Sequence, residues 1–290
     1  MQIVLSIVIS ALVAGSLFAL VAAGLSLVWG TLGVFNFAQG SLLMIGAYVA
    51  FYFGGNAWGR TGLLLGIPSG LVVLGLLGVV IYLILVRPFI GSPTGELAVI
   101  IATLAAGTFL ENGAQQFFGA TYRKLPPILT GHLSIAGNSV DWQQIIIMIV
   151  APVILLGLAM FLKFTKTGFA VRAVAQNEAS ALLLGIPVSR IYMFVFFVAA
   201  LLAALAGILF GGEFYVTPSM GGDLMLQAFI VVVFGGLGSL TGTVMAAYIV
   251  GLITAISQYY IGLFWTPAVL FTFLFIAVIV RPSGLVASDK

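Results

Sequence analysis

The chain contains no cysteine and a single histidine, His132. It therefore forms no disulfide, offers no thiolate to a metal and cannot build a histidine cluster, so we expect no metal site. Charged residues occupy only 6% of the 290 positions, whereas a soluble domain carries about a quarter. These absences argue against a metalloenzyme and against a water-soluble fold.

Apolar residues are abundant instead, at 62% of the sequence. Runs of about 20 such residues predict helices that span a bilayer. We therefore predict an all-α polytopic membrane protein with one transmembrane domain over residues 1–290. Its predicted spans lie near residues 3–29, 38–54, 63–86, 97–118, 143–162, 191–212, 224–238, 243–262 and 264–280.

Nine spans are expected, and eight and ten are the alternatives. The seventh is short, and the stretch that joins it to the eighth contains glycines at positions 235, 236, 238 and 242. This pair is consistent with one broken element or with a re-entrant hairpin. The stretches "WGTLGVFNFAQGSLLMIGAYV" and "FGGLGSLTGTVMAAYIV" also share Gly-x-Leu-Gly and a later aromatic residue, which makes them a candidate internal repeat.

The basic residues indicate the orientation, because short cytoplasmic loops carry an excess of lysine and arginine. Lys163, Lys166, Arg172 and Arg190 follow the fifth span, which predicts a cytoplasmic segment over residues 163–190. Counting spans outward from it puts the N-terminus outside and the C-terminus in the cytoplasm. The other basic residues then divide into Arg87, Arg281 and Lys290 inside and Arg60, Arg123 and Lys124 outside. The basic residues behind the formal charge of +3 are thus explained by membrane topology, so we expect no nucleic-acid partner. The expected surroundings of the chain are a lipid bilayer.

A polar stretch, "GVFNFAQGS", lies between the first two apolar runs and contains Asn36, Gln39 and Ser41. Lipid offers no partner to an amide side chain, and the flanking glycines allow close backbone approach. One interpretation is a broken or closely packed element beside a translocation path. The other is a plain turn at the inner membrane surface.

The fourth span carries polar residues along one side. Thr108, Asn112 and Gln115 recur at helical spacing, and Glu111 lies beside them. Because an acid inside a membrane is costly, it points to function by default, and we expect a polar face that lines an outward-facing cavity. The alternative is an acid at headgroup depth.

The glycine-rich stretch "FGGLGSLTG" contains Ser239. Close helix packing through small residues is one interpretation, and backbone exposed to a translocation path is the other. No lysine follows the glycines, so the stretch is not a P-loop. We expect no catalytic residues and no ATP hydrolysis in this chain.

The segment from Phe169 to Leu184 has no proline or glycine and predicts one amphipathic helix. Thr165 and Thr167 are candidate N-caps, and Gly185 followed by Pro187 is a typical stop. Such a helix can lie flat on a membrane or fill a groove in a partner. Only Arg172 and Glu178 are charged within it, which favours docking to a protein.

Three blocks of the chain resemble branched-chain amino acid ABC transporter permeases of the LivH type. They are "GVFNFAQGSLLMIGAYVAF", "TKTGFAVRAVAQNEASALLLGIPVSRIYMFVFFVAALLAALAGILFG" and "FGGLGSLTGTVMAAYIVGL". The resemblance implies a multi-pass permease of the prokaryotic plasma (inner) membrane that forms half of a path for hydrophobic amino acids. It also implies a LivM-type second permease, two cytoplasmic ATPases of LivG and LivF type that bind ATP and Mg²⁺, and an extracytoplasmic binding protein.

The resemblance further implies that the cytoplasmic segment docks on an ATPase. In ABC permeases the docking helix often carries Glu-Ala-Ala and then Gly, and here Glu178, Ala179 and Ser180 precede Gly185. The third position is thus serine, and the glycine comes one residue late. The expected coupling residues are Arg172, Glu178, Leu182, Gly185 and Pro187.

Two other functions stay open. Related permeases share these blocks, so the solute of the same importer architecture is alternatively urea, a short-chain amide or another small polar molecule. A secondary transporter needs coupling-ion or proton-relay residues within its spans, and only Glu111 is a good acidic candidate. A membrane enzyme is less compatible still, because the sequence shows no nucleophile and base constellation.

Overall fold

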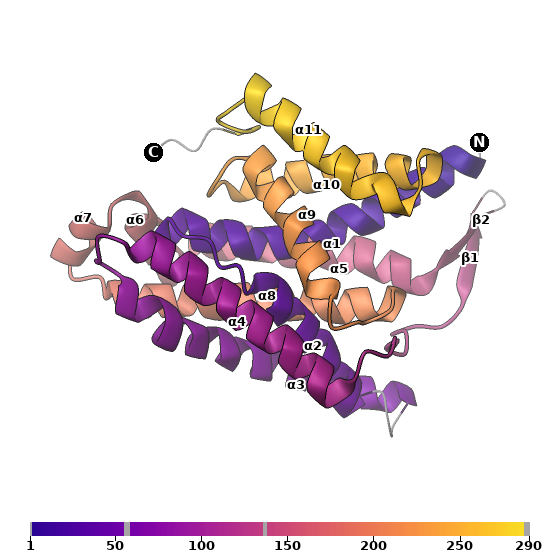
Figure 1. The fold of residues 1–290 in the computed structure, drawn as a ribbon, viewed down its shortest axis with the longest axis horizontal. Coiled ribbons are helices and arrows are strands. Elements are labelled where there is room, and N and C mark those ends of the chain that lie inside the picture. The colour runs from indigo at the N-terminus through magenta and orange to yellow at the C-terminus, as the bar shows by residue number, and fades with distance from the viewer. Residues whose placement is uncertain (1, 55–58, 136–137, 287–290) are drawn as a thin grey trace.

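The computed structural model describes residues 2–54, 59–135 and 138–286 (Figure 1). Lys290 and the side chain of Arg60, which entered the orientation argument, lie outside this description. The elements are α1 (Gln2–Leu32), α2 (Gln39–Gly54), α3 (Gly59–Ile81), η1 (Tyr82–Val86), η2 (Arg87–Phe89), α4 (Gly95–Phe118), β1 (His132–Ile135), β2 (Asn138–Asp141), α5 (Trp142–Phe164), α6 (Lys166–Gln176), α7 (Glu178–Leu183), α8 (Val188–Glu213), α9 (Met220–Gly235), α10 (Leu240–Tyr260), η3 (Leu263–Trp265) and α11 (Thr266–Val280).

The predicted spans have counterparts in the structure. In the part of the chain that the structure describes, seven helices are long and apolar enough to cross a membrane, and two further apolar helices, α2 and α9, are shorter. Together they match the nine predicted spans, which confirms the all-α polytopic fold. At 16 residues each, α2 and α9 are about 24 Å long, less than the hydrocarbon thickness of about 30 Å.

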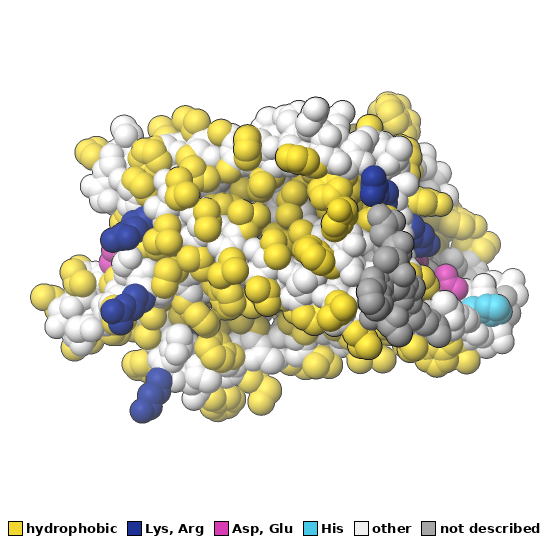
Figure 2. Space-filling view, turned by 90° about the horizontal axis from the view of Figure 1, so that it is seen from below, with side chains coloured by type: hydrophobic (Ala, Val, Ile, Leu, Met, Phe, Trp, Pro, Cys, Tyr) yellow, Lys and Arg dark blue, Asp and Glu magenta, His cyan; other side chains and the backbone are white. Residues whose placement is uncertain are grey.

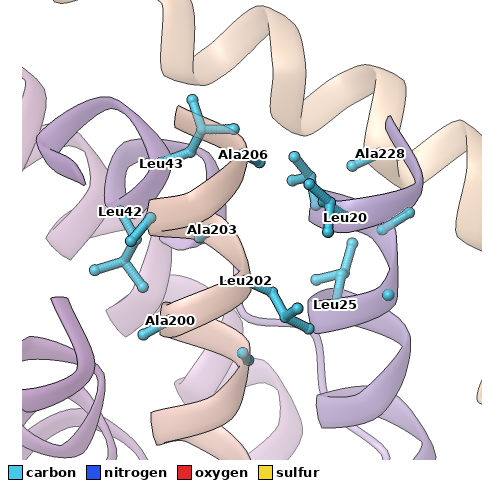
Figure 3. Close-up of a cluster of buried hydrophobic side chains, with 14 of the residues drawn as sticks. Leu20, Leu25, Leu42, Leu43, Ala200, Leu202, Ala203, Ala206 and Ala228 are labelled. Carbon is cyan, nitrogen blue, oxygen red and sulfur yellow. The ribbon is translucent and has the colours of Figure 1, made fainter. Parts of the chain in front are cut away.

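The centre of the bundle is built from α1 and α8, which pack against each other. Helix α8 also packs on α2 and α3, and α1 packs on α9 and α10. Figure 3 shows Leu20 and Leu25 of α1 beside alanines of α8, with leucines of α2 on the other side of α8. Small residues bring the backbones close, as is typical of helices that pack within membranes. A Cβ atom on Gly207 of α8, for example, would collide with the carbonyl oxygen of Leu43 in α2.

The two ends of the bundle differ in their elements. The end that carries α6 and α7, together with the C-terminus, is called the coupling end here, and the N-terminus and the β1–β2 hairpin lie at the opposite end, called the outer end (Figure 1). On the face drawn in Figure 2, lysine and arginine side chains gather near both ends, and the band between them is mostly hydrophobic. Because the two termini lie at opposite ends, the chain passes through the bundle an odd number of times, as the nine predicted spans require.

The connection between α4 and α5 contains a short β-hairpin. Strands β1 and β2 form an antiparallel pair in which His132 faces Asp141. Arg123 donates to the carbonyl oxygen of Phe118 at 2.7 Å, and its backbone pairs with Val216. Because the C-terminus of a helix carries partial negative charge, this contact accounts for a basic residue at the outer end.

The prediction of one helix over residues 169–184 is wrong, because the segment forms two helices. Asn177 has extended backbone angles and ends α6, and its side chain accepts a hydrogen bond from the Ser180 amide to start α7. The predicted boundaries are confirmed: Thr165 caps α6 by accepting from the Gly168 amide, and Gly185 ends α7 with a φ of 81°. The Ile186 amide then donates to the carbonyl of Ala181, which completes a Schellman motif.

Candidate functional site

The helices α2 and α9 meet N-terminus to N-terminus inside the bundle. Gly40 lies in the first turn of α2 and Gly221 in the first turn of α9, and a Cβ atom on either one would collide with the backbone of the other. From this junction α2 runs to the outer end, where Gly54 packs on Gly62 of α3. In the opposite direction α9 runs to the coupling end. Two short helices thus divide the depth of the bundle between them.

The stretch that precedes α2 is a non-helical break between α1 and α2, and Asn36 and Gln39 at its end are buried in the bundle. Gly33 ends α1 with a φ of 72°, and the chain then runs without helical structure to Gln39. The Phe37 amide donates to Thr103 Oγ1 at 3.2 Å, and Gln39 Nε2 donates to the carbonyl of Ala199 at 2.9 Å. Both acceptors belong to the interior of long helices, which fixes the depth of the break.

Two amides in this break have polar atoms without a partner among the described residues. Asn36 and Gln39 are 1% and 0% exposed, and Asn36 Oδ1 accepts from the Ala38 amide at 3.2 Å. Asn36 Nδ2 and Gln39 Oε1 make no hydrogen bond in the described structure. An unsatisfied buried polar atom costs about 1–3 kcal/mol, so both atoms would gain from any polar partner.

Glu111 of α4 lies beside the junction. The Ser41 hydroxyl in the first turn of α2 donates to Glu111 Oε1 at 3.3 Å, and a Cβ atom on Gly222 in the first turn of α9 would lie 4.0 Å from the same oxygen. The N-terminus of a helix carries partial positive charge, so two of them stabilise a carboxylate at this place. This arrangement places the acid beside two helix N-termini, and its depth in the membrane stays a prediction.

The polar side of α4 faces outward from the chain. Thr108, Asn112 and Gln115 are exposed, and only 22% of the most apolar window of this helix is buried. The Thr108 hydroxyl donates to the carbonyl of Leu104, and Asn112 Nδ2 donates to the carbonyl of Thr108, so both satisfy donors within their own helix. Their remaining polar atoms and those of Gln115 lie on the surface of the chain, where lipid would offer them no hydrogen-bond partner.

Ser239 lies away from this junction, in the turn between α9 and α10. Its hydroxyl accepts from the Gly242 amide at 3.2 Å and caps α10. The neighbouring Gly238 packs on Gly30 of α1, and Gly33 and Gly238 both have positive φ at the end of a Gly-x-Leu-Gly stretch. This geometry accords with close packing in the glycine-rich turn, and the internal repeat remains a prediction.

The expected coupling residues share one property, which is exposure at the coupling end. They are Arg172, Glu178, Leu182, Gly185 and Pro187. Next to them Leu183 and Leu184 are 89% and 80% exposed, so the tip of α7 presents three consecutive leucines. Arg172 donates to the carbonyl of Lys163 at the end of α5, which ties α6 back onto that helix.

One polar feature was missed by the sequence analysis. A cavity of about 370 Å³ opens near the outer end between α1, α5, α8, α9 and α10, and Glu213 and Asp223 line it with Gln144. Glu213 ends α8 and Asp223 lies in the first turn of α9, and nothing in their spacing along the sequence indicates a shared cavity. Within the described residues no group of three metal-ligating side chains comes together.

Comparison with known proteins gives a consistent result. Residues 7–280 match a family model described as "Branched-chain amino acid transport system / permease component". The high-affinity branched-chain amino acid transport system permease protein LivH of Escherichia coli (strain K12) is 30% identical over 294 residues, which cover 95% of this chain and 93% of that protein. The permease protein BraD of Pseudomonas aeruginosa is 28% identical, with 97% and 95% covered. A probable LivH permease of Methanocaldococcus jannaschii is 30% identical, with 87% and 80% covered.

Proposed function

Because the chain belongs to the family of permease components of branched-chain amino acid transport systems, we propose that it forms half of a membrane path for branched-chain amino acids in an ATP-driven importer. The chain is a multi-pass membrane transport subunit and not an enzyme. The structural observation that supports the proposal most directly is the exposed polar side of α4, next to the junction of α2 and α9.

The exposed side of α4 needs a cover other than lipid. Polar side chains within the hydrocarbon region face a protein or a water-filled cavity, because lipid satisfies none of their hydrogen bonds. Thr108, Asn112 and Gln115 are therefore assigned to a path shared with a second permease subunit, of LivM type. Amide and hydroxyl groups along such a path replace part of the hydration of a zwitterionic solute.

The junction supplies the charged part of this path. Glu111 presents a carboxylate to the ammonium group of the solute, and Ser41 holds that carboxylate in place. Asn36 and Gln39 behind it offer one unpartnered donor and one unpartnered acceptor. We assign these residues to solute passage and Ser239 to the adjoining glycine-rich turn.

The coupling end supplies the contact with the ATPases, which are of LivG and LivF type and bind ATP and Mg²⁺. Three exposed leucines at the tip of α7 form an apolar knob outside the spans, which suits a groove in a soluble partner. Thr165 joins α5 to α6 directly, and Pro187 leads directly into α8. Closing of the ATPase dimer therefore moves α5 and α8 with the docked segment and opens the path to one side at a time.

The proposal is tested with the purified importer in proteoliposomes, supplied with ATP and its extracytoplasmic binding protein. We expect uptake of labelled L-leucine that unlabelled L-valine competes with and that urea and acetamide do not. Uptake of urea or acetamide without uptake of leucine would assign the architecture to the alternative solutes. Uptake that persists without any ATPase in the membrane would instead support a secondary transporter.

The coupling role has its own test in the variant Leu183→Glu. Because a charge removes the apolar contact, we expect loss of the ATPases from the purified complex and loss of ATP-driven uptake. The matched control is Leu129→Glu, which changes an exposed leucine in the α4–α5 connection at the outer end. Equal ATPase content in both variants would contradict docking through α7.

A further inference from the structure

The cavity shares the first turn of α9 with the junction, and its described lining contains no residue of α4 and comes from a single chain. Its volume of about 370 Å³ falls within the range of small-molecule sites, about 300–1,000 Å³. Five helices line it, and much of the lining is apolar, including Leu17 and Phe18 of α1 and Phe210 of α8. The cavity has room for a small solute with a hydrophobic body.

The charges around this cavity are all of one sign. Among the described residues, Glu213 at the end of α8 and Asp223 in the first turn of α9 are the charged residues that line it, and no described lysine, arginine or histidine does. A cleft lined by one sign of charge concentrates solutes of the opposite sign. The mixture of carboxylates and apolar walls suits an ammonium group on an apolar body better than Ca²⁺ or Mg²⁺, which take six or more oxygen ligands.

Glu213 is held in position by α5. Gln144 Nε2 donates to Glu213 Oε1 at 2.7 Å, which leaves the other lone pairs of the carboxylate free for a second donor. Gln144 lies in the first turn of α5, and Glu213 is the last residue of α8. These are the two helices that flank the coupling segment, so this hydrogen bond joins them at the end opposite to α6 and α7.

We propose that this cavity is a binding site for the ammonium group of a small apolar amino acid, with Glu213 as the primary acceptor and Asp223 as the second negative charge. The assignment of the solute rests on the proposed function, whereas the preference for an ammonium group rests on the cavity alone. The site is complete in one chain and does not need the second permease subunit.

The absence of cysteine makes a direct test available. In the full importer in lipid nanodiscs, Ser10→Cys places one thiol of this chain in the cavity lining, and Ser6→Cys places one a helical turn away, outside the lining. The rate of modification is measured on this chain with a cationic and an anionic methanethiosulfonate reagent. We expect the cationic reagent to be favoured at position 10 by about tenfold over the anionic one, relative to position 6.

Protection then identifies the group that binds. L-leucine and isoamylamine, which share the ammonium group, are expected to slow modification at position 10 in a saturable manner and to leave position 6 unchanged. Isocaproate, which keeps the apolar body and lacks the ammonium group, is expected to give no protection. In the background of Glu213→Gln, which keeps the shape of the side chain, the charge preference and the protection are expected to fall together.

The result overturns the proposal if isocaproate protects as well as isoamylamine, if position 6 is protected equally, or if Glu213→Gln changes neither measurement. Leucine uptake is measured in proteoliposomes of the same variants, and the subunit composition of each preparation reports whether the variant is assembled. Uptake of leucine without protection refutes this site and leaves the proposed function standing. Protection by isoamylamine without uptake of leucine supports the site and refutes the proposed function.

Discussion

The helices α8 and α4 are both predicted and observed spans, but they have opposite surroundings. In α8, 61% of the most apolar window is buried, and in α4 only 22% is. Alanines and glycines let α8 pack closely on three neighbouring helices, whereas α4 exposes amides, a threonine and an acid. One helix is thus packed within this chain, whereas the other presents the polar surface that we propose a second subunit covers.

The largest expected effect comes from the same substitution made in both helices. Gly207→Ala in α8 drives a methyl group into the carbonyl of Leu43. Gly113→Ala in α4 adds a methyl group at a place where no neighbouring atom lies within 4 Å. We expect Gly207→Ala to destabilise the fold by about 3 kcal/mol, because overpacked cores relax poorly. Gly113→Ala is expected to be neutral or slightly stabilising. Thermal unfolding of the purified chain measures both, and equal midpoints would remove the contrast.

A smaller effect is expected at Glu111, where the two regions meet. Glu111→Gln keeps the shape of the side chain but removes the charge that the helix N-termini of α2 and α9 stabilise. We expect leucine uptake to fall by about tenfold, which corresponds to about 1.4 kcal/mol, with the subunits still assembled. Uptake and subunit composition are measured on the same preparation. Loss of assembly with unchanged turnover per complex would assign Glu111 to packing.

The smallest effect is expected on the exposed side of α4. Asn112→Leu makes this surface more compatible with lipid, so the isolated chain should unfold at the same temperature or higher. Uptake by the importer is expected to fall about threefold, because one weak polar contact of the path is lost. The matched control is Phe109→Leu, which alters an apolar residue of α4 that is 76% exposed. Unchanged uptake in Asn112→Leu would indicate that this side of α4 meets lipid.

The fold was predictable where the signal is local. Apolar runs located every span, and Thr165 and Gly185 marked the limits of the coupling segment because caps depend on neighbouring residues. The break at Asn177 carried a local signal as well, since asparagine is a preferred N-cap, but the surrounding alanine and leucine favoured a continuous helix.

The site was predictable only in its components. Glu111 and Ser41 were both candidates, but their hydrogen bond joins residues 70 positions apart, and no periodicity indicates it. The junction of Gly40 with Gly221 and the outer cavity depend in the same way on long-range packing. A sequence pattern identifies which side chains are costly in a membrane, and the tertiary structure decides which of them share a site.

The contact between Gly40 and Gly221 also limits how this sequence can change over time. Neither position accepts even a methyl group, because each backbone occupies the space that a Cβ atom of the other would need. A change at one glycine is therefore not rescued by a change at the other, and we expect single substitutions at either position to be selected against. Like other glycine pairs with mutual backbone contact, such as Gly54 with Gly62 and Gly235 with Gly242, this pair should vary little among descendants of this sequence.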